Sequence, residues 1–273
     1  MTRSSKRKSS IIRNRFLDDE LRKLSRPLVG ENLILEEMDL TSLRPYKLVH
    51  QEVFLRRTPL SIFRRLHFSE KEKRKARLQI LLALCLDRIQ GALDLLFSFV
   101  EDFERPIRLD SVVDVRKNYN LGDFGLAWAW LKGTPDIVTL VRNNVFLAVE
   151  GLETEMPIVE IARGIDGILN QLPTVDEYSE EKEGVFHEIQ SKTPTPIKIP
   201  AGEVLAIGTI PKIKKDVGFT FFLTTSGSIN RDITNPDKWY YRAGMDKGEH
   251  TITMLWGDAG ILPKKAQLNI AIT

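Results

Sequence analysis

Cysteine is almost absent from this sequence of 273 residues, and long apolar runs are absent altogether. The single cysteine, Cys85, excludes an intrachain disulfide. It lies in the apolar segment LQILLALCLDRI, where burial favours an unreactive core thiol. The most hydrophobic window, residues 78–100, is interrupted by charged and polar side chains. The sequence therefore predicts no transmembrane segment.

The sequence also lacks the motifs of the common enzyme classes. Its four histidines are scattered, and none has the paired spacing of a metal site. A glycine-rich phosphate loop and a G-x-S-x-G nucleophile turn are both missing. We therefore predict no catalytic residue, no metal and no cofactor. An enzyme whose site gathers residues distant in sequence stays open as an alternative.

Charge is distributed unevenly along the chain. Residues 1–77 hold twenty Lys and Arg against ten Asp and Glu, which gives about +10, and the remainder carries about −7. Residues 1–17 are predicted to form a disordered basic arm, because they offer almost nothing to bury. No apolar core of a secretory signal follows this basic start. A cytoplasmic location is the default expectation, and an extracytoplasmic one applies if a signal was removed.

Two arginine pairs stand out in the basic portion. Phenylalanines are interleaved with the pairs, which are Arg56, Arg57, Arg64 and Arg65. Cations that follow phosphates and rings that stack on bases are typical of a single-stranded nucleic-acid platform. These arginines therefore indicate binding to nucleic acid or another anionic surface as an alternative function. The aromatic side chains fit a protein core equally well.

The clearest predicted helix begins at Ser69 and ends near Phe103. Ser69 is a favourable cap, and apolar side chains recur at helical spacing from Leu78 to Val100. We expect this long helix to be the central packing element of the first domain. Before it, residues 46–57 alternate in a pattern that is typical of an edge strand.

Residues 118–151 are predicted to form an antiparallel hairpin. Two apolar segments rich in β-branched and aromatic residues flank a polar turn at 132–136. A polar break at 142–144 predicts a bulge or a change of register in the second strand.

One face of this hairpin is a candidate ligand platform. Trp128 and Trp130 are two positions apart and share a face, and Arg142 and Asn144 lie on the paired strand. Aromatic rings beside an arginine or asparagine can hold sugars, peptides or bases. Packing in the core is the alternative role for the tryptophans.

A helix predicted over residues 156–172 follows the hairpin. The words GDFGLAWAW, VRNNVFLAVEG and VEIARGIDGIL occur in this order. In that order of elements, residues 110–172 resemble small α+β domains of bacterial exported and sensor proteins. The predicted class of residues 18–173 is accordingly α+β, with a long helix packed on an antiparallel sheet.

The chain changes character after residue 173. Residues 174–195 are acidic and lead into Thr-Pro-Thr-Pro at 193–196, so we place a linker there. Residues 196–273 contain short strand candidates separated by turn residues, which predicts an all-β sandwich. Loop aspartates such as Asp232 are spaced as turn residues rather than calcium ligands.

The C-terminal segment resembles bacterial immunoglobulin-like and cadherin-like modules. The resemblance lies in Pro-Ala-Gly-Glu at 200–203, GEHTIT at 248–253 and a closing strand at 269–272. It implies a sandwich that presents loops or an edge strand to a partner. The function predicted from the whole sequence is non-enzymatic binding or assembly through protein–protein interaction, with another protein or a second copy as the partner.

Overall fold

The computed structural model describes part of the chain, and every structural statement below concerns that part: residues 16, 28–31, 33, 46–69, 78–86, 89–102, 111–129, 134–151, 156–178, 186, 189, 195–209, 218–257, 260 and 262–273. Two compact units are present. The first comprises residues 1–177 with 260–262, and the second comprises 178–259 with 263–273. The domain boundaries drawn from the sequence stay predictions. The predicted basic arm, residues 1–17, lies outside the described residues apart from Phe16.

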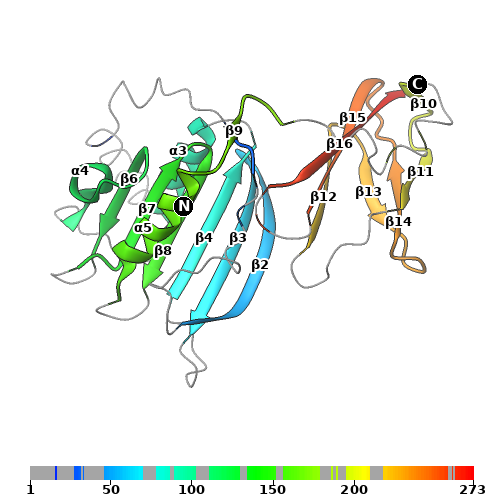
Figure 1. The fold of residues 1–273 in the computed structure, drawn as a ribbon. Helices are drawn as coiled ribbons and strands as arrows, with labels where there is room; N and C mark the ends of the chain where they lie inside the picture. The colour runs from blue at the N-terminus through cyan, green and yellow to red at the C-terminus, as the bar shows by residue number, and fades with distance from the viewer. Residues whose placement is uncertain are drawn as a thin grey trace. The chain divides into compact units, whose positions relative to one another are not determined.

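A seven-stranded antiparallel sheet dominates the first unit (Figure 1). Its strands lie in the spatial order β2 (Lys47–Arg57), β3 (Leu60–Ser69), β4 (Leu78–Cys85), β8 (Val145–Gly151), β7 (Ile137–Arg142), β6 (Phe124–Trp128) and β5 (Val113–Asp114). The edge strand predicted over residues 46–57 is confirmed, because β2 borders this sheet. A separate two-stranded ribbon pairs β1 (Leu28–Val29) with β9 (Thr174–Val175).

Helices cover both faces of the seven-stranded sheet. Side chains of α3 (Ile89–Asp102) share one core with Phe146 and Ala148 of β8. The predicted helix at 156–172 is confirmed as α5 (Ile158–Leu169), which packs on β7 and β8. A β-carbon at Gly151 would lie 3.0 Å from Ile158 Cδ1. Since side chains alternate along β8, α5 contacts the face opposite α3.

The predicted helix from Ser69 to Phe103 is wrong over residues 78–85. These residues form β4, between β3 and β8, and the described helix begins only at Ile89. A central strand covered on both faces is apolar at nearly every position, so the same run satisfies helical spacing and strand pairing alike. The expected α+β class with a long helix on an antiparallel sheet is therefore wrong. Strands predominate, and the described helices are short.

The predicted hairpin is confirmed, because β6 and β7 pair antiparallel. The polar break in its second strand is a turn rather than a bulge. β7 ends at Arg142, Asn143 and Asn144 form the turn, and β8 returns antiparallel from Val145. Asn143 has a φ of 52°, and asparagine tolerates this left-handed conformation better than most residues. Two adjacent asparagines therefore split one predicted strand into two.

Seven strands of the second unit form two sheets in its described part (Figure 1). The first sheet has the order β10 (Ile197–Ile199), β16 (Lys264–Ile272), β15 (Gly248–Gly257) and β12 (Phe219–Thr224), and the second has the order β11 (Val204–Thr209), β14 (Lys238–Arg242) and β13 (Ser228–Arg231). One core contains Ile207 and Tyr241 from the second sheet together with Ile252 and Leu268 from the first. The arrangement is compatible with a β-sandwich.

Among the described helices of the chain, none has the length and apolar character needed to span a bilayer.

Asn144 ties together distant segments of the first unit through its buried side chain. Its Nδ2 donates a hydrogen bond of 2.5 Å to the carbonyl of Cys85, next to α3. Its Oδ1 accepts a hydrogen bond of 2.8 Å from the N–H of Val29 in β1. One turn residue thereby fixes both the end of β4 and the ribbon that contains β1.

We expect Asn144→Ala to lower the free energy of unfolding by about 2–4 kcal/mol, because the buried N–H of Val29 loses its acceptor and the Cys85 carbonyl loses a donor. Chemical denaturation of the full chain measures the loss. Asn230→Ala, at an exposed position, serves as the control and should change stability by less than about 0.5 kcal/mol. Equal losses in the two variants would contradict this role of Asn144.

Candidate functional site

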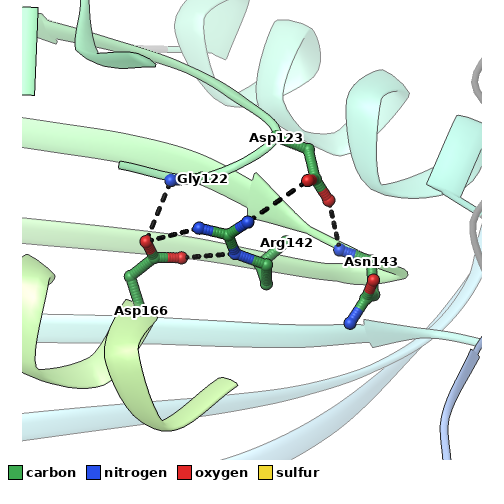
Figure 2. A network of polar contacts seen from close by, with 5 residues as sticks. All are labelled: Gly122, Asp123, Arg142, Asn143 and Asp166. Carbon is green, nitrogen blue, oxygen red and sulfur yellow. Dashed lines mark hydrogen bonds and ion pairs between the residues drawn. The ribbon is translucent and has the colours of Figure 1, made fainter. Parts of the chain in front are cut away.

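A cluster of polar contacts surrounds the guanidinium of Arg142 at the end of β7 (Figure 2). Its Nε and Nη2 donate to the two carboxylate oxygens of Asp166 on α5, at 2.8 and 2.7 Å. This two-bond geometry is the strong form of an arginine–carboxylate pair. Its Nη1 donates to Asp123 Oδ1 at 3.3 Å. The guanidinium thus joins a helix to the loop before β6.

Backbone N–H groups complete the cluster. The N–H of Gly122 donates to Asp166 Oδ2 at 3.0 Å, and the N–H of Asn143 donates to Asp123 Oδ2 at 2.8 Å (Figure 2). Each carboxylate therefore accepts from both the arginine and the main chain. Both carboxylates are occupied as hydrogen-bond acceptors, so this arrangement favours a positioning role over proton transfer.

The segment between α4 (Val115–Tyr119) and β6 adopts its shape for local reasons. Asn120 ends α4 in the left-handed region, with a φ of 56°. Gly122 has a φ of 67°, and a β-carbon there would lie 3.0 Å from both Leu140 Cβ and the Val141 carbonyl oxygen. Only glycine fits such a position without strain. The resulting reversal aims the Gly122 N–H at the carboxylate of Asp166.

Burial strengthens the electrostatics of this cluster. The Arg142 side chain is 17% exposed, and the side chains of Asp123 and Asp166 are 3% and 6% exposed. The hydrogen bonds from Arg142 to Asp166 raise the pKa of the guanidinium, burial lowers it, and the net shift is upward. Arg142 therefore stays charged and holds its two partners at any ordinary pH.

A pocket of about 600 Å³ lies over this cluster. α4 contributes Arg116 and Tyr119 to its lining, α5 contributes Arg163, and Asn170 follows directly after α5. Arg142 and Asp166 also line it. The pocket is therefore a polar depression. Inside it the charges of Arg142 and its two carboxylates compensate one another, and Arg116 and Arg163 are exposed at its rim.

The structure places the residues of the predicted ligand platform in separate environments. Trp128 is 1% exposed within the core beneath α3, which favours the packing role over ligand contact. Trp130 lies outside the described residues. Arg142 is in the polar pocket, whereas Asn144 is fully buried in the turn contacts described above. Ligand binding by this set stays a prediction, and only Arg142 lies in the pocket.

The four arginines predicted to bind nucleic acid are not brought together. Arg65 lies opposite Glu52 and forms a 2.6 Å ion pair with it. Arg64, its neighbour in the chain, points to the other face of the sheet and is fully buried. Arg56 and Arg57 are likewise adjacent in β2 and therefore also point to opposite faces. Nucleic-acid binding by the four as one surface stays a prediction that this alternation disfavours.

Histidines that are separate in sequence meet on β2 and β3. The ring centroids of His50 and His67 are 5.7 Å apart. Burial, followed by the charges of His50 and Arg65, lowers the pKa of His67. His187 lies outside the described residues. Within the described part of the chain, no group of three or more His, Cys, Asp or Glu residues could hold a metal ion.

Sequence reasoning missed Asp123, Asp166, Arg116 and Arg163. One signal was available: Asp166 follows Ile165 within the stripe of α5 that is otherwise apolar and buried. A carboxylate on the inner face of an amphipathic helix requires a partner. Pairing with Arg142 could not be read from the chain, because the two residues are 24 positions apart.

A second candidate surface is the loop between β13 and β14. Asp232 Oδ1 accepts from the N–H and the hydroxyl of Thr234, each at 2.7 Å, and from the N–H of Asn235 at 3.0 Å. The Arg231 guanidinium carbon lies 5.8 Å from the centroid of the Trp239 ring. Ile233, at the tip of this ordered loop, is 98% exposed.

No known protein family matches this sequence, and no curated protein matches it.

We expect Asp166→Asn to lower the free energy of unfolding by about 2–3 kcal/mol, because it leaves Arg142 with one fewer compensating charge in a partly buried site. Thermal and chemical denaturation of the full chain measure the change. Asp176→Asn, which removes the same charge at an exposed position of the first unit, is the matched control. An unchanged stability for Asp166→Asn would show that the ion pair does not position α5.

Proposed function

We propose that this chain is a non-enzymatic binding protein that acts through protein–protein contact, and that its second unit is an immunoglobulin-like module presenting the loop at residues 231–238. The observation that carries the proposal is the near-complete exposure of Ile233 on a loop whose residues are joined by the hydrogen bonds that Asp232 accepts. An apolar side chain kept rigid in water is suited to fill an apolar pocket on a partner protein.

The strand partition supports the immunoglobulin-like part of the proposal. Counted in chain order from β10, the second, fifth and fourth strands (β11, β14 and β13) form one sheet. The third, sixth and seventh strands (β12, β15 and β16) lie together in the other. Immunoglobulin sandwiches of the constant type divide their second to seventh strands in this way, and they place the first strand with the second, fifth and fourth. Here the first strand lies in the other sheet. The first strand, β10, pairs in parallel with the last, β16. Domains of this architecture commonly bind partners through the loops at their ends.

The distribution of exposed apolar side chains supports the choice of the second unit. Among the described residues, the exposed large hydrophobic side chains are those of Val49, Val204, Ile233 and Met245. Three of these belong to the second unit. Ile233 is the most exposed, and Asp232 forms hydrogen bonds with Thr234 and Asn235 around it. Pre-ordering of this kind lowers the entropic cost of association.

The direct test places a photo-crosslinking amino acid at position 233 of the full-length protein in cells that naturally produce it. A single protein should be crosslinked from position 233 and not from Asn269, which is exposed on β16. Identification by mass spectrometry then gives the purified pair. A second copy of this chain is one outcome that supports the proposal, and no specific crosslink overturns it.

With the purified pair, Ile233→Asp should raise the dissociation constant by about 10- to 100-fold, because burial of an isoleucine side chain contributes about 1.5–3 kcal/mol to binding. Asn269→Asp adds the same negative charge elsewhere on the unit and should leave the constant unchanged. Calorimetry or surface plasmon resonance measures both. Equal affinity for the wild type and Ile233→Asp would exclude this loop as the contact.

The order of the loop has its own test. The Thr234 hydroxyl, followed by the N–H groups of Asn235 and Thr234, lowers the pKa of Asp232 to about 2. Because this pKa is below the ordinary value of 3.8, these bonds stabilise the loop above that value and are lost as the pH falls through about 2. Thr234→Ala should raise the pKa of Asp232, and Thr234→Ser should preserve it. Carbon-detected NMR titration of the carboxyl group measures both; no difference would contradict the hydroxyl's role.

A further inference from the structure

The pocket on the first unit has a chemistry that protein–protein contact through the second unit does not use. It has a volume of about 600 Å³, which is within the range of pockets that hold small molecules. Its lining combines charged groups with the phenol ring of Tyr119, the amide of Asn170 and the side chain of Leu121. Such a site offers both polar and ring contacts to an occupant.

The negative charges of the pocket are already compensated. Asp166 and Asp123 both accept hydrogen bonds from Arg142, and each also accepts from a backbone N–H. Because both carboxylates already compensate the charge of Arg142, they would hold a further cation less strongly. The interior cluster therefore forms a rigid floor rather than a cation site.

The positive charges at the rim are not compensated in the same way. Arg116 on α4 and Arg163 on α5 are both exposed, and both line the pocket. Within the part of the chain that the structure describes, neither guanidinium has an ion-pair partner. Two arginines from different elements thus line one depression. The Arg142 cluster holds α5, which carries Arg163, and the segment that follows α4, which carries Arg116.

We propose that this pocket binds a small organic anion, whose carboxylate or phosphate group lies between Arg116 and Arg163. Guanidinium groups match the oxygen geometry of both anions and bind them through paired hydrogen bonds. The volume exceeds what a bare oxyanion requires, so the remainder of the ligand contacts Tyr119 and Asn170. Carboxylate and phosphate share the recognition chemistry, and the experiment separates them.

The test uses the purified full chain and two probes, citrate for the carboxylate class and adenosine 5′-monophosphate for the phosphate class. Isothermal titration calorimetry at low salt should give a dissociation constant of about 1 mM or tighter for one of the two. The probe that binds more tightly identifies the class of anion. Binding should weaken as salt is added, because exposed charges are screened.

Arg116→Gln and Arg163→Gln should each weaken binding of that probe by about tenfold or more, because each removes a charge-assisted pair of hydrogen bonds. Arg163→Lys keeps the charge but loses the planar fork, so its affinity should fall between those of the wild type and Arg163→Gln. Lys47→Gln removes one positive charge from an exposed position on β2 and is the matched control.

The melting temperature of each variant checks that the fold is intact, and the exposed positions of both arginines lead us to expect no change. If one Gln variant does not fold, the affinities of Arg163→Lys and of the remaining Gln variant for the probe decide whether the proposal holds. Failure of both probes to bind, or equal weakening by Lys47→Gln, overturns the proposal. These outcomes are independent of crosslinking at residue 233, so the two proposals can fail separately.

Discussion

The ion pair between Arg142 and Asp166 is the contact on which the arrangement of the first unit depends. It joins the end of β7 to the buried face of α5, while Asp123 and the Gly122 N–H bring in the chain before β6. Buried ion pairs add little net stability, because desolvation offsets their attraction. Their geometry is nevertheless specific, and breaking one side is costly. We infer that the cluster fixes position and orientation more than it adds to the free energy of folding.

Such fixing matters because α5 also carries residues that face outward. With its inner side held by Asp166, Arg163 is directed toward the same pocket as Arg116. The apolar contacts of α5 with β7 and β8 are not directional. A two-bond arginine–carboxylate pair tolerates much less displacement. The internal charges therefore determine where the external charges lie.

The two units offer different kinds of recognition. The first unit presents a polar depression with exposed guanidinium groups, which favours a small charged ligand. The second unit presents an apolar side chain on a loop ordered by Asp232, which favours a shaped apolar surface on a protein.

Sequence patterns predicted several elements well and failed where more than one structure satisfied the pattern. The edge strand β2 and α5 each have a polar side, so their periodicity indicates the correct element. β6 and β7 are buried along almost their whole length, and their pairing was predictable because a polar turn at 132–136 separates two apolar segments. β4 has no polar side, because β3, β8 and both covering layers surround it, and its apolar run was therefore assigned to a helix. At residues 142–144 the polar break was recognised, but turn and bulge both fit until the pairing of β8 was known.

The amino-acid sequence by itself determined the short strands of the C-terminal half, the amphipathic helix and the absence of intrachain disulfides, since these follow from local periodicity and composition. Only the tertiary structure decided that Asp123, Arg142 and Asp166 meet, and that Arg65 lies opposite Glu52. The physical reason is that ion pairs and pockets form between residues distant in the chain. Their positions depend on strand register and helix placement, which no local pattern contains.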